Sequence, residues 1–120
     1  MDYKFINTEY LDSVSGGDSE IVSEIVDLFK DQVIEIHNEM NSLLAEKDYH
    51  ALGMLAHKAK SSVAIMGMAD LAVLLKNFEL EAKINKDPEN YVSYIARFGE
   101  ETKSAVIELD DLVKNRLKKS

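Results

Sequence analysis

The sequence predicts an all-α protein, an up-down-up-down antiparallel four-helix bundle with a short additional helix at its N-terminal end. Three observations lead to this fold class. Helix breakers are rare, since the 120 residues include one proline and five glycines. Apolar residues recur at three- and four-residue spacing along four long segments, as on the buried face of a helix. Strict alternation of apolar and polar residues, which is typical of a half-buried strand, is not found over six or more residues.

Each long segment carries one apolar stripe that we expect to face the core. The first comprises Ile21, Ile25, Leu28, Gln32, Ile36, Met40 and Leu43, with one polar interruption. The second comprises Leu52, Leu55, Ala56, Ala59, Val63 and Met66, and the third Met68, Leu71, Leu74, Leu75, Phe78 and Ala82. The fourth comprises Val92, Ile95, Phe98, Thr102, Val106, Leu109 and Val113. Because the connections are short, successive helices are expected to run antiparallel.

Residues that begin and end helices fall at the edges of these stripes. The predicted N-caps are Thr8, Asp18, Asp48 and Asp87. Pro88 follows the last of them as the expected first residue of the fourth long helix. Residues 16–17 are two glycines and predict a turn, and Gly67 is expected to end the second long helix in a left-handed conformation.

Length and composition limit the kind of protein. An apolar content of 46% in 120 residues suits one globular domain, expected to span residues 1–120. The absence of cysteine excludes disulfides, thiolate zinc sites and cysteine nucleophiles. No apolar run approaches the roughly 20 residues of a membrane span, and the first residues do not resemble a signal peptide, so we expect a soluble, cytoplasmic protein. A net charge of −8 makes nucleic acid an unfavourable partner.

His57 stands out on the second long segment. It lies one residue past the core position Ala56, about 100° round the helix from it, so its ring is expected at the border of the buried face. The residues one turn away are Gly53, Met54, Lys60 and Ser61. Gly53, Ser61 and Ala64 are small and favour close approach by another molecule; a glycine inside a helix costs roughly 1 kcal/mol against alanine and so needs a reason. Lys58 and Lys60 add a basic spot.

A neutral imidazole in such a place is a nucleophile near physiological pH. Attack on an aspartyl phosphate would give a phosphohistidine whose phosphoryl group can be passed on. This transfer mainly requires positioning and charge neutralisation, which Lys60 would supply. Glu79 on the next segment would orient the ring of His57 through its other nitrogen if the two helices pack side by side. A lone histidine at a helix border is more often an ordinary surface residue, and spacing alone leaves that interpretation open.

The segment Ala56–Met68, AHKAKSSVAIMGM, resembles the signature of histidine-containing phosphotransfer (HPt) domains. The phosphoacceptor histidine of that signature, its lysine, the small residue after the lysine and the later glycine align with His57, Lys60, Ser61 and Gly67. The resemblance covers about residues 11–79 well and the last helix only by pattern. Two positions depart from it, since the family commonly has leucine at Ala59 and glycine at Ser61. These changes affect packing and clearance but keep the histidine and the lysine.

The resemblance implies a phosphorelay carrier and not an enzyme, with His57 as phosphoacceptor and Lys60 as the residue that stabilises the phosphoryl group. The expected partners are receiver domains of response regulators and of hybrid histidine kinases, bound by a monomer. Receivers hold the magnesium of such reactions, so no metal or cofactor is expected in this chain. The docking surface is expected to comprise Gly53, Met54, Lys58, Ser61, Ala64, Ile65 and Met68. For Ile65 and Met68, core packing explains the pattern equally well.

Three other functions fit parts of the pattern. A histidine kinase would need an ATP-binding domain, for which 120 residues of bundle leave no room. A metal site of the di-iron bundle type would need Glu-x-x-His pairs, and none of the three histidines has a glutamate three residues before it. A bundle that docks receivers without phosphotransfer is the alternative that stays open, although this chain keeps both the histidine and the lysine.

Overall fold

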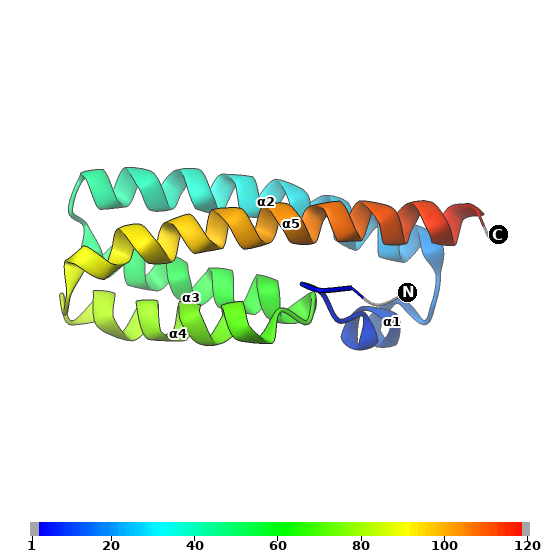
Figure 1. Ribbon diagram of the computed structural model, residues 1–120, viewed down its shortest axis with the longest axis horizontal. Helices are drawn as coiled ribbons and strands as arrows, with labels where there is room; N and C mark the ends of the chain where they lie inside the picture. The colour runs from blue at the N-terminus through cyan, green and yellow to red at the C-terminus, as the bar shows by residue number, and fades with distance from the viewer. Residues whose placement is uncertain (1–2, 119–120) are drawn as a thin grey trace.

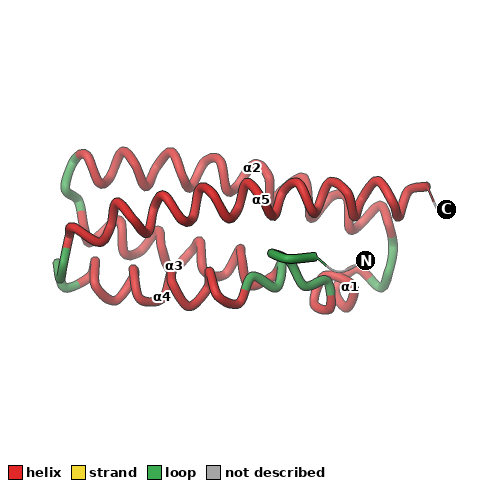
Figure 2. The backbone as a smooth tube through the Cα atoms, in the orientation of Figure 1, coloured by secondary structure: helices red, strands yellow, loops and turns green. Residues whose placement is uncertain are grey.

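The computed structural model describes residues 3–118, of which 116–118 are described by their backbone only. Its elements are α1 (Glu9–Ser15), α2 (Ser19–Ala45), α3 (Tyr49–Ile65), α4 (Ala69–Lys83), the 3-10 helix η1 (Pro88–Asn90) and α5 (Tyr91–Lys118). The remainder of the described chain forms turns and loops, without a strand (Figure 2). The all-helical prediction is therefore confirmed. Residues 1–2 and 119–120 of the predicted domain lie outside the described residues.

The four long helices lie along the long axis of a molecule that measures 49 × 21 × 20 Å (Figure 1). Figure 1 shows the chain turning back at each connection, so that α2, α3, α4 and α5 alternate in direction. The most extensive packing joins α3 to α4, and α2 to α5; contacts of α2 with α3 and of α4 with α5 close the ring. The short α1 contacts α2. None of the helices within residues 3–118 is long and apolar enough to cross a membrane.

The apolar stripes predicted for α3 and α4 are buried in full. Every residue of both stripes is at most 8% exposed. The α3 stripe includes Ala56 and Ala59, both 0% exposed, whose small side chains let a neighbouring helix come close. Burial of this stripe fixes the rotation of α3 and therefore the side of the helix that faces solvent.

The stripe predicted for α2 is wrong over its first half. Ile21 and Leu28 are 40% and 63% exposed, whereas their neighbours Val22 and Phe29 are buried. Adjacent apolar residues at 21–22, 25–26 and 28–29 create two overlapping stripes about 100° apart, and the neighbouring helices cover the second of them. The predicted and observed stripes coincide again farther along α2, at two fully or largely buried positions, Ile36 and Met40.

The stripe predicted for α5 is correct in its middle and wrong at its start. The buried predicted residues are Ile95, Phe98, Thr102 and Leu109. Val92 is 61% exposed, and Tyr91 takes the buried place instead. The Tyr91 hydroxyl lies 2.9 Å from the carbonyl oxygen of Glu81 and 2.7 Å from that of Lys86. This hydroxyl therefore ties the start of α5 to the end of α4 and to the loop that follows it.

The caps that set the ends of α3 agree with the sequence. Asp48 accepts a hydrogen bond from the backbone N–H of Ala51 at 3.2 Å, as a predicted N-cap should. Gly67 has φ 74° and follows the helix in the left-handed region, as predicted. The cap of α2 is also confirmed, because Asp18 accepts from the N–H of Glu20 at 2.9 Å.

Two other predicted caps are wrong. Thr8 makes no side-chain capping bond to α1; Asn7 replaces it by accepting a hydrogen bond from the N–H of Glu9 at 2.9 Å. Asp87 also makes no side-chain capping bond and has φ 50°. Pro88 does begin a helix, but that helix is η1, which leads into α5. The N-cap predictions fail at α1 because Asn7 is the acceptor there, and at η1 because the chain turns at Asp87.

The segment before α1 crosses the end of the α3–α4 hairpin, and the sequence did not predict this contact. The N–H of Asn7 donates to the carbonyl of Met66 at 3.0 Å. The backbone N–H groups of residues 4–6 donate to the Glu108 carboxylate on α5, at 2.9 to 3.1 Å. Gly67 lies directly beneath this segment, since a Cβ there would be 2.7 Å from the backbone nitrogen of Asn7.

Candidate functional site

His57 lies on the outer side of α3, between the buried residues Ala56 and Ala59. Its side chain is 58% exposed, which agrees with the expected position at the border of the buried face. The capped ends of α3 and its buried stripe determine this position, because together they fix both the length and the rotation of the helix. The imidazole is therefore presented to solvent by a rigid helix and not by a loop.

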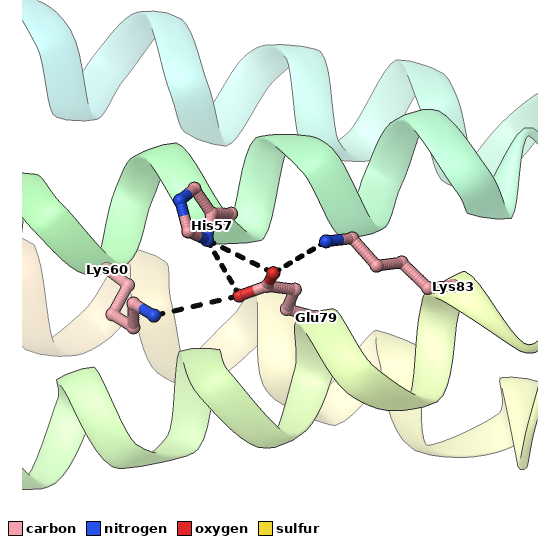
Figure 3. A network of polar contacts seen from close by, with 4 residues as sticks. All are labelled: His57, Lys60, Glu79 and Lys83. Atoms are coloured by element: carbon pink, nitrogen blue, oxygen red, sulfur yellow. Dashed lines mark hydrogen bonds and ion pairs between the residues drawn. The ribbon is translucent and has the colours of Figure 1, made fainter.

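Glu79 on α4 holds one side of this ring. The Nδ1 atom of His57 lies 3.0 Å from Oε1 and 3.1 Å from Oε2 of Glu79, whose side chain is 9% exposed (Figure 3). An ionised carboxylate only accepts hydrogen bonds, so Nδ1 carries the hydrogen and donates it. When the ring is neutral, Nε2 then holds the free lone pair. Figure 3 shows this second nitrogen on the side of the ring away from Glu79.

Two lysines complete the group of charges, and we call His57, Lys60, Glu79 and Lys83 the Glu79 cluster. The Nζ of Lys83 lies 2.7 Å from Oε2 of Glu79, at i,i+4 on the same helix. The Nζ of Lys60 lies 3.8 Å from Oε1, which is a longer and weaker ion pair. His57 and Lys60 come from α3, and Glu79 and Lys83 from α4, so the cluster spans the most closely packed helix pair (Figure 3).

These neighbours lower the pKa of the Glu79 carboxyl from its ordinary value of 4.5. The hydrogen bond from Lys83 is the main cause; burial opposes it by raising the pKa, and the hydrogen bond and charge of His57 lower it further. Glu79 is therefore ionised at neutral pH, as its role as an acceptor for the His57 ring requires.

Replacing Glu79 with glutamine is expected to lower the free energy of unfolding at neutral pH by about 1 kcal/mol, because charge-assisted hydrogen bonds are lost. The folded state lowers the pKa of Glu79, so this stabilisation is complete above the unfolded value near 4.5 and disappears as the pH falls through the lower folded value. Urea unfolding over this pH range should show the difference between wild type and Glu79→Gln closing in acid. Glu100→Gln, at an exposed position of α5, is the charge-matched control. A difference that stays constant with pH would contradict the argument.

Most of the predicted docking surface does lie on one face around His57. The exposed members are Met54, Lys58, Ser61, Ala64 and Ile65. Met54 is 58% and Ile65 37% exposed. Met68, by contrast, is 3% exposed and belongs to the core. Its placement on the docking surface is therefore wrong, because the turn at the end of α3 rotates its side chain inward against the neighbouring helices.

Gly53 is also buried, and it serves the packing of α3 on α4 and not the approach of a partner. A Cβ at this position would lie 3.0 Å from Cγ of Lys83 and 3.1 Å from the carbonyl oxygen of Glu79. Both distances are tighter than ordinary van der Waals contact. Its expected place on the docking surface is wrong, and the reason for a glycine inside this helix is the close passage of α4.

Lys83 is the one member of the Glu79 cluster that the sequence analysis missed. Its spacing of four residues after Glu79 on a predicted helix was a usable signal, because such pairs are neighbours on a helix surface. The sequence could not show that this pair faces His57. Within residues 3–118, no group of three or more histidine, aspartate or glutamate side chains is arranged to hold a metal ion.

Comparison with protein-family models matches residues 24–115 to the Hpt domain. The matched region begins within α2, ends within α5 and contains the whole Glu79 cluster. Comparisons with curated proteins and with solved structures gave no match. With most of its length covered by that model, this chain belongs to the Hpt domain family.

Proposed function

We propose that this protein is a phosphorelay carrier in which His57 accepts a phosphoryl group from the aspartate of one receiver domain and passes it to another. The family supplies the general role, since Hpt domains are phosphocarrier modules of histidine phosphotransfer and not kinases. The observation that supports the specific proposal is the state of the His57 ring. Glu79 binds Nδ1, while a side chain that is 58% exposed leaves Nε2 available to a partner.

The transfer step uses the lone pair of Nε2. This nitrogen attacks the phosphorus of an aspartyl phosphate, an N–P bond forms, and the P–O bond to the acyl group breaks. The aspartate leaves as a carboxylate, and the ring keeps the hydrogen on Nδ1, so it becomes a phosphorylated imidazolium. Glu79 stabilises that new positive charge through its bond to Nδ1. Transfer to a second receiver is the reverse of this step with a different aspartate.

In this proposal, Lys60 neutralises the phosphoryl oxygens. It lies one turn after His57 on α3, and its Nζ is only loosely held by Glu79, at 3.8 Å. The exposed residues around the ring form the surface on which a receiver docks. Apart from Lys58, these residues are small or apolar. A basic spot in a chain of net charge −8 complements the acidic pocket of a receiver.

We extend the proposal to the whole molecule. Residues 1–120 form one domain, an up-down-up-down antiparallel four-helix bundle with α1 as the short additional helix. It works as a monomer in the cytoplasm, with receiver domains of response regulators and hybrid histidine kinases as partners. The alternating helix directions and the single core shared by the four long helices support the bundle and the single domain.

Incubation with a receiver domain phosphorylated by acetyl phosphate tests the proposal. The expected result is acid-labile, base-stable label on the protein, which then moves to a second, unphosphorylated receiver. If no receiver in a broad panel transfers label, the phosphotransfer proposal fails. Binding of receivers without any label would instead favour a docking bundle that regulates receivers and carries no phosphoryl group.

Lys60→Ala is expected to slow phosphoryl transfer by about tenfold to a hundredfold, because one cation near the transferring group is lost. The fold should be unaffected, since the ion pair to Glu79 is long and partly exposed. Single-turnover transfer from a phosphorylated receiver measures the rate, and the decay of the label measures phosphohistidine lifetime. Lys58→Ala, an exposed lysine on the same helix, separates loss of phosphoryl stabilisation from loss of docking charge. Unchanged transfer rate and lifetime in Lys60→Ala would remove Lys60 from the mechanism.

A further inference from the structure

One carboxylate in the Glu79 cluster serves three partners, and they do not hold it equally. The contact to Lys83 is short at 2.7 Å, the contacts to His57 measure 3.0 and 3.1 Å, and the contact to Lys60 measures 3.8 Å. With its side chain 9% exposed, Glu79 has little water to screen its charge. The charge that His57 experiences therefore depends on how strongly Lys83 neutralises the same carboxylate.

A carboxylate beside the ring has two opposite effects on phosphoryl transfer. It stabilises the phosphorylated imidazolium after transfer. Before transfer it also stabilises the protonated imidazolium, in which Nε2 carries a hydrogen and has no lone pair for attack. An unneutralised Glu79 would thus favour the inactive form of His57. A second cation on the carboxylate reduces this penalty and still leaves Glu79 bound to Nδ1.

We infer that Lys83 is a positioning residue that acts through Glu79 to keep His57 neutral, with the hydrogen on Nδ1 and the lone pair on Nε2. This inference rests on the proposed phosphotransfer at His57. It gives Lys83 a role different from that of Lys60. Lys60 turns toward the incoming phosphoryl group, whereas Lys83 stays on Glu79 throughout the reaction.

The contact between Lys83 and Glu79 is built into the helix packing, unlike an ordinary i,i+4 surface pair. The stem of Lys83 crosses α3 at Gly53, where an added Cβ would lie 3.0 Å from Cγ and 3.2 Å from the backbone nitrogen of Lys83. Gly53 is buried, and its missing side chain is the space that the lysine stem occupies. The ammonium group is therefore directed to Oε2 by the packing of α3 on α4.

The other elements around the cluster do not offer a replacement for Lys83. From α2, Gln32 reaches α3; it is uncharged and accepts a hydrogen bond from Ser62 at 3.1 Å. Toward α5, α4 presents Glu81, whose carboxylate accepts from the hydroxyl of Tyr94 at 2.6 Å. Among the described residues, the cations in contact with Glu79 come from α3 and from α4 itself.

The test compares three variants of α4 in the full chain. Lys83→Gln removes the cation, Lys83→Arg restores it, and Lys76→Gln makes the same change of net charge at an exposed lysine of the same helix. Nitrogen-15 NMR of the His57 ring reports its protonation and tautomer without any phosphoryl donor. Transfer rates from a receiver domain phosphorylated by acetyl phosphate, measured against pH, report the consequence for the reaction.

Lys83→Gln is expected to raise the imidazolium fraction of His57 at neutral pH and to move the rising limb of the transfer profile to higher pH, because Glu79 then faces the ring without its short contact to a cation. Lys83→Arg and Lys76→Gln should behave like wild type. An unchanged ring state in Lys83→Gln overturns the inference, and so does an equal shift in Lys76→Gln, which would show a general effect of net charge. If wild type takes up no phosphoryl group from any receiver, the proposed function fails, while the ring spectra still decide the role of Lys83 in positioning His57.

Discussion

Replacing His57 with glutamine is expected to abolish phosphoryl uptake and to change the free energy of unfolding by less than about 1 kcal/mol. The loss is complete because an amide nitrogen is not a nucleophile and no second imidazole belongs to the Glu79 cluster. The fold survives because the side chain is 58% exposed and, within the described part of the chain, its polar contacts go to Glu79. A glutamine amide can still donate a hydrogen bond to that carboxylate.

The measurement is label uptake from a phosphorylated receiver, with urea unfolding on the same samples. His50→Gln is the matched control, since His50 is also exposed on α3 and lies outside the Glu79 cluster. It should take up label like wild type. Label on His57→Gln at the wild-type level would place the phosphoryl group on another residue. Loss of uptake in both variants would point to a damaged fold or docking surface and not to a lost nucleophile.

The sequence predicted helices well where only one apolar stripe was available. On α3, residues 56–63 are polar except at the three buried positions Ala56, Ala59 and Val63, so the buried face and the outward position of His57 follow from spacing. On α2, paired apolar residues such as Ile21 with Val22 and Leu28 with Phe29 allow two faces. Choosing between them requires the positions of the other helices, which spacing within one helix does not contain.

The same limit explains which residues of the Glu79 cluster could be predicted from the sequence. His57 and Lys60 lie one turn apart on a single helix, so local spacing brings them together before any packing is known. Glu79 and Lys83 reach them only through the packing of α4 on α3, which is close because Gly53 has no side chain. From the sequence alone, this glycine indicates clearance for a partner protein. In the structure, the space beside it is filled by α4. Helix ends were predicted well at Asp18 and Asp48, and poorly at α1, where the neighbouring Asn7 and not Thr8 accepts the hydrogen bond.

Gly67→Ala is expected to lower the free energy of unfolding by about 3 kcal/mol. Part of the loss, about 1 to 2 kcal/mol, comes from placing a Cβ on a residue with φ 74°. The remainder comes from overpacking, typically about 1 to 3 kcal/mol, because the new Cβ would lie 2.5 Å from Cβ and 2.7 Å from the backbone nitrogen of Asn7. The backbone of Asn7 cannot move away without stretching its hydrogen bond to Met66, which measures 3.0 Å.

Gly16→Ala separates the two contributions, because Gly16 has a similar φ of 62° but open space where its Cβ would be. It should cost only about 1 kcal/mol in urea unfolding. Amide hydrogen exchange then shows which segment moves to relieve the overpacking in Gly67→Ala. The amides of residues 4–7 should exchange faster, because their hydrogen bonds hold this segment on α5 and on the end of α3. Equal losses of unfolding free energy in the two variants, with unchanged exchange in residues 4–7, would mean that the N-terminal segment does not constrain the end of α3.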